Sequence, residues 1–312
     1  VSQHIGDVTV SNNLIVSGAG SDAASWDAGF YNAGDGNIIA SGAATVINGA
    51  KLSRSIQNGT FGTLTIGAKG LYDAGPTTTI TTGSLTDNDT FTHNNGEVVM
   101  QSSGGDLDGT STTTFYDLTS ENFIDVTKSI NVENTMKALG SNSWRFVTNQ
   151  TITMGTATGS GRIEVGTASG KGMRFTNLNK TYKFEAASEA YPWIGISSGA
   201  GWNNGEPGNT IELTGCDMQF AFNTQGSGGD EAVTWKVANA EFDAVTVDSG
   251  DTLIVSSGQR VAFGGTVTIP ADGIIVSGAL VEMKGAGNWS ETGYQQHIGR
   301  ATAALMWNST GY

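Results

Sequence analysis

The sequence predicts an all-β protein, a right-handed parallel β-helix (a β-solenoid) with coils of about 21 residues and a more irregular middle. Three observations support this fold. Glycine accounts for 45 of the 312 residues and only 14% of the residues are charged, so the chain is polar through Gly, Ser, Thr and Asn. A short strand-like word recurs along the chain. One stretch also shows strands at a spacing of about seven residues.

The recurring word consists of three or four β-favouring residues that end in Ser-Gly. Ile15 and Ile39 occupy the same place in two copies near the N-terminus, and Ile254 and Ile275 do so in two later copies. The separation within each pair is close to the roughly 20 residues that are typical of solenoids, in which each coil stacks on the next. The copies lie at residues 13–18, 37–42, 252–258 and 273–278.

The stretch 244–284 shows how one coil is built. Short runs of β-branched and aliphatic residues alternate there with turns rich in Gly, Ser and Asp. Three strands at a spacing of about seven make the repeat of a parallel β-helix with three faces. A meander of antiparallel hairpins would also need Gly-rich turns, but its strands would be longer, at about 5–6 residues. The runs lie at 245–247, 253–255, 261–263, 267–269, 274–276 and 280–283.

The organisation along the chain is predicted in three parts. Residues 1–111 form N-terminal solenoid coils, 112–240 an elaborated, aromatic-rich β middle, and 241–312 C-terminal coils with a terminal cap or assembly segment. The middle contains two candidate short helices, at 134–139 and 184–191.

The two ends of the chain are candidates for assembly. A solenoid leaves strand edges open at both ends, and these invite pairing unless they are capped. The apolar segment that contains Leu305, Met306 and Trp307 fits a plug or a partner-binding strand. The word Gln-His-Ile-Gly occurs at both 3–6 and 296–299. This indicates either chance in a repetitive chain or a recurring junction, for head-to-tail stacking or for processing.

Charge and composition exclude several classes of protein. With 15 Lys and Arg against 29 Asp and Glu, the net charge is −14, so the chain lacks the basic surface that nucleic acids require. No apolar run approaches the roughly 20 residues of a membrane-spanning helix. The single cysteine, Cys216, excludes an internal disulfide framework and is better explained as a small buried residue than as a nucleophile.

Calcium is the one metal that the sequence favours. The three histidines lie far apart in the sequence, which argues against zinc. Calcium takes carboxylate and carbonyl oxygens from loops, and the candidate ligands are Asp87, Asp89, Asp106 and Asp108. Asp is also an ordinary turn former through its local hydrogen bonds, so both interpretations remain open. No other cofactor is expected.

Exposed aromatic residues are candidates for contact with glycans. Trp26, Tyr31 and Trp202 lie in polar, Gly-rich surroundings, and an aromatic ring there could stack on a sugar. Packing at the solenoid cap or at a subunit interface is the alternative. A glycan-cleaving enzyme would need two paired carboxylates, and no pair is singled out by its context. We therefore expect no enzymatic activity.

One segment resembles a repeat found in β-helical surface proteins of bacteria and in virion proteins of their phages. The words are Phe-Thr-His-Asn-Asn-Gly at 91–96 and Thr-Phe-Tyr-Asp-Leu-Thr at 114–119, followed by an Asn- and Val-rich coil at 130–134. Glu97 and Asp117 depart from the usual Thr and Asn. The resemblance covers 90–134 and implies a fibre, adhesin or virion-surface architecture, with no catalytic residues to carry over.

These observations lead to one expected function and two alternatives. We expect a non-enzymatic structural or adhesive protein of a virion surface, such as a phage fibre, spike or capsid decoration. It would act through a homo-oligomer, either a trimer or a stacked assembly, and contact other virion or cell-surface proteins, with host glycans as further candidate partners. The alternatives are a secreted bacterial adhesin or filament subunit and a polysaccharide-degrading β-helix enzyme. All three predict an extracellular or virion-surface location.

Overall fold

The structure is a computed structural model whose described part is built from β-strands alone. It describes residues 2–4, 7–18, 31–33, 36–54, 58–139, 144–156 and 161–165, and beyond these only short strands up to 304–308. The described residues contain no helix, and every strand pair in them whose register is given is parallel. The prediction of a parallel β-solenoid is therefore confirmed. The chain forms two compact units, Val1–Trp144 and Arg145–Tyr312, and the three-part division stays a prediction.

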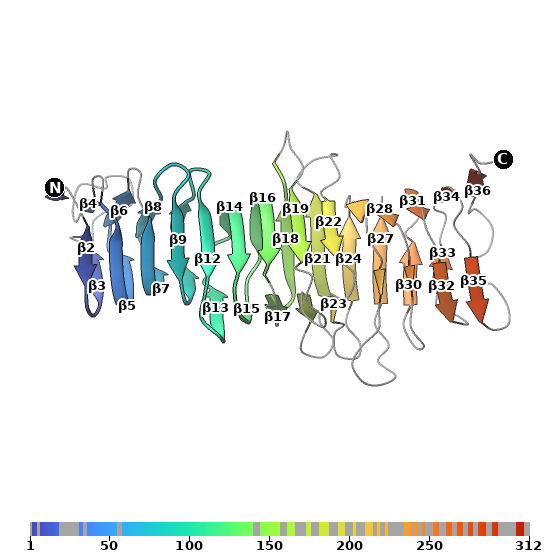
Figure 1. Cartoon of the computed structure of the whole chain (residues 1–312), viewed down its shortest axis with the longest axis horizontal. Helices are drawn as coiled ribbons and strands as arrows, with labels where there is room; N and C mark the ends of the chain where they lie inside the picture. The colour runs from blue at the N-terminus through green and yellow to red at the C-terminus, as the bar shows by residue number, and fades with distance from the viewer. Residues whose placement is uncertain are drawn as a thin grey trace. The chain divides into compact units, whose positions relative to one another are not determined.

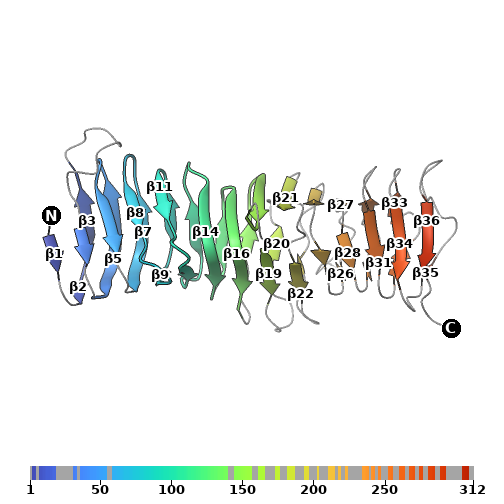
Figure 2. The same cartoon turned by 90° about the horizontal axis from the view of Figure 1, so that it is seen from above.

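The first unit contains three rows of parallel strands, and each coil contributes to all three. Long strands such as β5 and β7 belong to two rows. The register of the β5–β7 pairing shifts between Ala40 and Ala43, where the strand passes from one row to the next. Figures 1 and 2 show β5, β7, β9, β14 and β16 following one another in chain order. The strands are β1 (Ser2–His4), β2 (Val8–Val10), β3 (Leu14–Ser17), β4 (Tyr31–Ala33), β5 (Ile38–Ile47), β6 (Lys51–Arg54), β7 (Gly59–Ile66), β8 (Leu71–Asp73), β9 (Thr79–Thr82), β10 (Leu85–Asp87), β11 (Thr90–Thr92), β12 (Glu97–Met100), β13 (Gly105–Asp108), β14 (Thr113–Ser120), β15 (Ile124–Val126) and β16 (Ile130–Ala138).

The second unit has the same kind of strand rows. β17 (Trp144–Phe146) contains the division between the units. One row is β18 (Gln150–Met154), β21 (Thr181–Ala186), β24 (Thr210–Thr214), β27 (Thr234–Ala238), β30 (Thr252–Val255) and β33 (Ile274–Val276). A second row contains β19 (Arg162–Val165), β22 (Trp193–Ile196), β25 (Asp217–Met218), β28 (Ala240–Phe242), β31 (Arg260–Phe263), β34 (Leu280–Lys284) and β36 (Ala304–Asn308). A third row contains β20 (Met173–Phe175), β23 (Trp202–Asn203), β26 (Phe222–Asn223), β29 (Val245–Thr246), β32 (Val267–Pro270) and β35 (Trp289–Thr292).

Coil length varies more than the sequence predicts. Two later copies of the recurring word stack as expected, because Ile254 pairs with Ile275. The first two copies do not stack on each other, because Ile15 pairs with Thr45 and passes over Ile39. Coils elsewhere are both shorter and longer than the predicted repeat. β14 and β16 are joined by a short coil, whereas the coil between β18 and β21 is much longer.

The two predicted helices are wrong where the structure describes them. Residues 134–138 belong to β16, whose Thr135 pairs with Asp117 of β14. The local helix preference of this segment is overridden because the strand ladder buries Met136 and Ala138 in the core. In the second segment, residues 184–186 end β21, and 187–191 lie outside the described residues.

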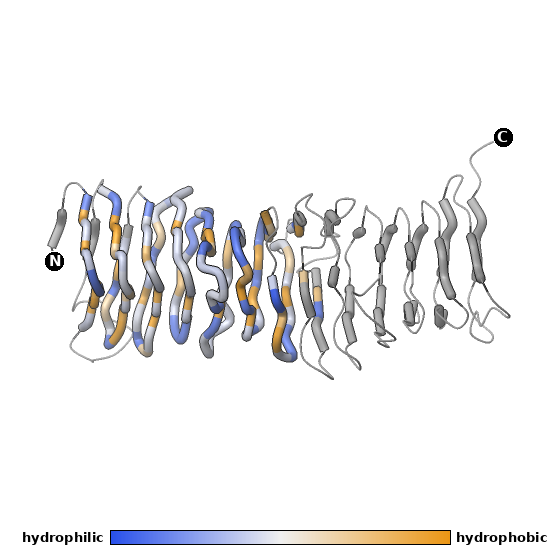
Figure 3. Tube along the Cα trace, turned by 60° about the horizontal axis from the view of Figure 1, so that its bottom comes forward, coloured by the Kyte–Doolittle hydropathy of each residue, from blue (hydrophilic) through white to orange (hydrophobic). Residues whose placement is uncertain are grey.

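The core is made of columns of inward-facing side chains. Leu64, Leu85 and Leu107 stack in register on successive coils, each with at most 1% of its surface exposed. Alternate residues face outward, and Figure 3 shows the resulting change between hydrophobic and hydrophilic residues along the first unit. An aromatic column accompanies them. Tyr72 stacks on Phe91 at a ring-centroid distance of 5.8 Å, and Phe91 contacts Phe115 at 5.6 Å.

Polar side chains link the coils along the same axis. The Oδ1 atom of Asp7 accepts the backbone N–H of Asn37 at 2.8 Å, and the Oδ1 of Asn37 accepts that of Asn58 at 3.2 Å. The Oδ1 of Asn58 in turn accepts the N–H of Thr79 at 2.8 Å. These residues precede or begin strands of one row. Each side-chain-to-backbone hydrogen bond therefore adds one more link, which we call a side-chain rung, at the start of the backbone hydrogen-bond ladder between two strands.

Candidate functional site at the Asp87 corner

One corner of the first unit buries a charged cluster. The strands β10, β13 and β15 stack there in successive coils. Asp87 is the last residue of β10, two residues after the inward-facing Leu85, so strand alternation turns its side chain into the core. Lys128 lies just after β15. The side chains of Asp87 and Lys128 are 1% and 5% exposed.

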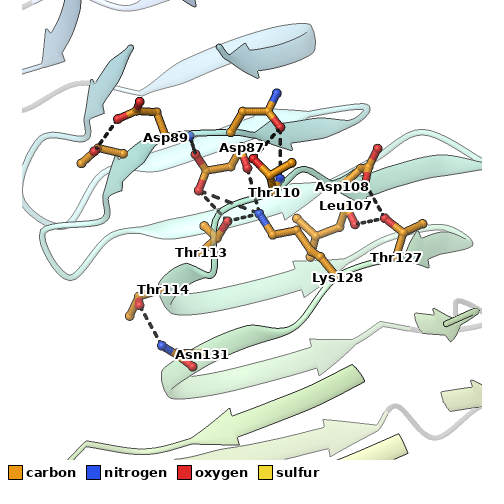
Figure 4. Close-up of polar contacts among 12 residues, drawn as sticks. Asp87, Asp89, Leu107, Asp108, Thr110, Thr113, Thr114, Thr127, Lys128 and Asn131 are labelled. Carbon is orange, nitrogen blue, oxygen red and sulfur yellow. Dashed lines mark hydrogen bonds and ion pairs between the residues drawn. The ribbon is translucent and has the colours of Figure 1, made fainter. Parts of the chain in front are cut away.

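Thr113 connects these two residues through its hydroxyl group. Its Oγ1 donates to Asp87 Oδ2 at 2.6 Å and accepts from Lys128 Nζ at 2.7 Å. The ammonium group also donates to the backbone carbonyl oxygen of Asp87 at 3.1 Å and lies 4.0 Å from Asp87 Oδ2. The backbone N–H of Asp89 donates to the other carboxylate oxygen, Oδ1, at 3.2 Å. Figure 4 shows the carboxylate, hydroxyl and ammonium groups facing one another.

Burial sets the electrostatics of this cluster. Removal from water lowers the pKa of Lys128, and the negative charges of Asp87 and Asp108 oppose that shift. A buried ion pair of this kind gains little net stability, because the loss of hydration offsets most of the attraction. The cluster therefore holds an amine whose charged form is disfavoured next to a carboxylate that is almost fully buried.

Asp108 occupies the outer surface of the same corner. Its Oδ1 accepts the Thr127 hydroxyl at 2.7 Å. This hydrogen bond, together with the backbone N–H of Gly109 and the nearby Lys128 charge, holds the pKa of Asp108 below its ordinary value. Thr127 also donates to the Leu107 carbonyl. The hydroxyl groups of Thr113 and Thr127 thus donate to acceptors of the preceding coil, Thr113 on the inner and Thr127 on the outer side of the corner.

The four predicted calcium ligands have separate surroundings. Asp87 faces an ammonium group, and Asp89 accepts the backbone N–H of Lys69 at 2.7 Å and the Thr90 hydroxyl at 2.9 Å. Asp106 and Asp108 lie on the exposed face of β13. In the described part of the chain, no three His, Cys, Asp or Glu side chains gather closely enough to hold a metal ion. Calcium binding at these aspartates stays a prediction.

The other predicted residues are placed only by their backbones. Tyr31 begins β4 and pairs with Leu52, and Trp202 begins β23 and pairs with Met173. Trp26 lies outside the described residues. The assembly candidates Leu305, Met306 and Trp307 all belong to β36 and pair with Val281, Glu282 and Met283 of β34.

The segments that carry the resemblance contact one another around a sharp turn at Asn94 and Asn95. The Nδ1 atom of His93 accepts the backbone N–H of Asn95, and its ring stacks on Tyr116 with a centroid distance of 6.0 Å. Asn94 and Asn95 both adopt positive φ angles, of 46° and 60°, which Asn tolerates better than most residues. The Nε2 atom of His93 lies 3.4 Å from the carboxylate of Glu133, which belongs to a later coil.

The two residues that depart from the resembling repeat, Glu97 and Asp117, also form side-chain hydrogen bonds. Glu97 accepts the Thr119 hydroxyl at 2.6 Å, and Asp117 accepts from the Asn134 side chain at 2.8 Å. Both acidic residues therefore receive hydrogen bonds from the next coil, as the neighbouring ladder residues do. The segment marked by the resemblance is a well-connected piece of the coil stack.

Sequence reasoning missed Lys128 and Thr113. Lys128 is 41 residues from Asp87 and Thr113 is 26 residues from it, and neither belongs to a recognisable motif. The available signal was the scarcity of cations: a single Lys between two short strands, in Asp-Val-Thr-Lys-Ser, is unusual in a chain with 15 Lys and Arg residues.

Comparison of the chain with protein-family models, curated proteins and solved structures finds no match. Within the described residues, no helix is long and apolar enough to span a membrane.

Proposed function

We propose that this chain is a non-enzymatic structural and adhesive protein of a virion surface, such as a phage fibre, spike or capsid decoration. It acts through homo-oligomeric assembly and surface contact. The observation that carries the proposal is the position of β36, the strand with the predicted assembly residues Leu305, Met306 and Trp307: among the described strands it is the edge strand of its sheet. An edge strand of this kind is a template for pairing with a further chain.

The first coil of the first unit also supports assembly. Val8 and Val10 are only half-buried, whereas Ile38 and Ala40, which pair with them in the next coil, are 0% and 1% exposed. A further layer of strands placed on this coil would cover Val8 and Val10, and complete burial of such a side chain stabilises by about 1.5–3 kcal/mol.

The polarity of the strands restricts the form of such an assembly. A second copy that continues a parallel row must offer a coil edge of the opposite polarity, which is a head-to-tail contact. A trimer would instead pack the outer faces of three copies side by side. Both arrangements fit a virion fibre or spike.

Removal of β36 tests the assembly. A chain that ends at Ala303 lacks β36, and a matched chain that ends at Asn308 lacks only residues 309–312 and keeps the strand. We expect the full chain and the matched control to sediment as oligomers, and the shorter chain to lose assembly while it keeps its β-type circular dichroism spectrum. An unchanged oligomer without β36, or a full chain that is monomeric at all concentrations, contradicts the proposal.

The surface on which the protein acts needs its own experiment. Gold-labelled antibodies against the chain should decorate purified virions in electron micrographs. Labelling of bacterial surface filaments instead would favour the adhesin alternative. Release of oligosaccharides from host capsule by the purified chain would show an enzyme.

A further inference from the structure

We propose that Lys128 and Asp87 condense to an intramolecular isopeptide bond, an amide between Nζ and Cγ that covalently joins two coils of the solenoid. The inference is independent of the proposed function. It rests on three groups around the Asp87 carboxylate: the Thr113 hydroxyl and the Lys128 ammonium group lie near Oδ2, and the backbone N–H of Asp89 donates to Oδ1 (Figure 4). A buried amine, a proton relay and an oxyanion donor are what amide formation from a carboxyl group requires.

The first requirement is a neutral amine beside a neutral carboxyl group. The Thr113 hydroxyl lies between the two partners, 2.7 Å from Nζ and 2.6 Å from Oδ2. As Nζ gives a proton to the hydroxyl oxygen, the hydroxyl passes its own proton to Oδ2. An ammonium–carboxylate pair thereby becomes an amine and a carboxylic acid without any charge leaving the site. Burial favours the neutral amine in this exchange, because removal from water lowers the pKa of Lys128.

The second requirement is stabilisation of the tetrahedral intermediate. When the Nζ lone pair attacks Cγ, negative charge develops on Oδ1. The backbone N–H of Asp89 already donates to this oxygen at 3.2 Å, so the donor is in place before the reaction. Removal of a comparable oxyanion donor in enzymes costs about 10²–10³ in rate.

The third requirement is a leaving group that departs as water. Nζ loses a second proton through the Thr113 hydroxyl to the Oδ2 hydroxyl, the bond between Cγ and Oδ2 breaks, and one water molecule leaves. Of the three protons on the ammonium group, two end in the water and one remains on the amide nitrogen. The charges of the two partners cancel, and no oxidant or other reactant is needed.

The position of the bond explains what it would achieve. Lys128 reaches past β13 to a residue 41 positions earlier in the chain, so the amide would close a loop that contains the whole intervening coil. The contact at 3.1 Å between Nζ and the Asp87 carbonyl oxygen anchors the amine at this corner. Nζ lies 4.0 Å from Oδ2, and attack requires it to come within roughly 3–3.5 Å of Cγ, the carbon that carries this oxygen.

Mass spectrometry of the denatured full-length chain tests the proposal. We expect the folded protein, after purification and incubation, to have the sequence mass less one water. Trypsin should then fail to cut after Lys128, and a branched peptide should link Asp87 to Lys128. Three Asp-Gly pairs in the sequence could also lose water as succinimides, so the branched peptide, rather than the mass alone, decides the result.

Two substitutions of the reacting residues make the test specific, and a third probes the relay. Asp87→Asn should lose ammonia instead of water and reach the same final mass as the cross-linked wild-type chain, because the product is the same amide. Lys128→Arg should keep its full sequence mass, since a guanidinium group does not react. Thr113→Val should form the bond more slowly. A folded wild-type chain with the full sequence mass and cleavage after Lys128 would overturn the proposal, as would a wild-type chain that has lost water but yields no branched peptide between Asp87 and Lys128.

Discussion

Lys128 donates a hydrogen bond to the backbone carbonyl oxygen of Asp87, although the two residues are 41 positions apart and a complete coil separates them. The strand β13 lies between the strands that precede Lys128 and carry Asp87. The side chain therefore spans two coil steps inside the solenoid, whereas the amide ladders connect only adjacent coils. Because this interaction joins coils that are not adjacent, we expect the stability of the first unit to depend on the whole cluster.

Loss of the Lys128 amine should strongly destabilise the protein. Lys128→Met leaves the Asp87 carboxylate buried with no cation beside it, which we expect to cost about 3–5 kcal/mol. Asp87→Asn added to the same chain removes the uncompensated charge and should recover part of that loss. Urea unfolding followed by circular dichroism measures both values. Equal stability of Lys128→Met and the wild type would show that the ammonium group contributes nothing.

The stability of the corner should depend on pH through Asp108. Its pKa in the folded protein is lowered, mainly by the Thr127 hydroxyl, and lies below the ordinary value of about 3.9 that the unfolded chain has. Its contribution is therefore present above about pH 3.9 and is lost as the pH falls through the folded-state pKa. Thr127→Val should raise the pKa of Asp108, which NMR titration of its carboxyl carbon can follow. An unchanged titration in that variant would contradict this account.

The two glycines that flank β13 provide a matched pair. Gly109 has a φ of +125°, and a Cβ there would lie 2.0 Å from the carbonyl oxygen of Asp87. Gly104 also has a positive φ, of +76°, but a Cβ there meets nothing within 4 Å. We expect Gly104→Ala to cost about 1 kcal/mol from backbone strain alone, and Gly109→Ala more than about 3 kcal/mol. Thermal unfolding compares them, and similar losses would show that the close approach to Asp87 does not matter.

The side-chain rungs between coils should contribute individually. Asn58→Ala removes the acceptor for the backbone N–H of Thr79 and should cost about 1 kcal/mol. Asn58→Asp keeps an acceptor oxygen and serves as the control. Hydrogen exchange of the Thr79 amide gives a local readout, with faster exchange expected only in the alanine variant. Equal protection in both variants would exclude the rung as a source of stability.

The aromatic column should carry much of the packing in the first unit. Phe115 is fully buried and contacts Phe91 at a centroid distance of 5.6 Å. Phe115→Ala should cost about 3–5 kcal/mol, because it removes buried surface and leaves a cavity. Phe115→Leu keeps most of the volume and should cost clearly less. A loss below about 1 kcal/mol for the alanine variant, measured by urea unfolding, would mean that the column can collapse around the gap.

The repeating parts of the fold could be predicted from the sequence, and the reasons are local. The spacing of Ile254 and Ile275 indicates the true stacking register, because the length of that coil matches the predicted repeat. The same reasoning fails for Ile15 and Ile39. Ile15 pairs with Thr45, since the coil that separates them is longer than the repeat assumes. The segment 134–138 fails for a different reason: burial of Met136 decides its conformation, and burial is a property of the assembled stack.

The candidate site could be predicted only in part. The sequence points to Asp87 and Asp89 because acidic residues in turns can bind calcium. Their oxygen atoms are engaged with hydroxyl groups, backbone amides and an amine of the protein itself. The partners Thr113 and Lys128 come from later coils, so their proximity depends on the exact length of two coils. Coil length varies along the chain, so the strand spacing of one coil does not give that of the next.

The variation in coil length has a consequence for how such a chain can change. Thr113 of β14 pairs with Ile130 of β16 across a short coil, and Gln150 of β18 pairs with Tyr182 of β21 across a much longer one, yet both pairs of strands remain parallel. The number of residues between paired strands therefore varies while their parallel pairing is kept. The scaffold can accept coils of different length, so recognition surfaces could be exchanged between relatives or grafted by design while the frame that displays them persists.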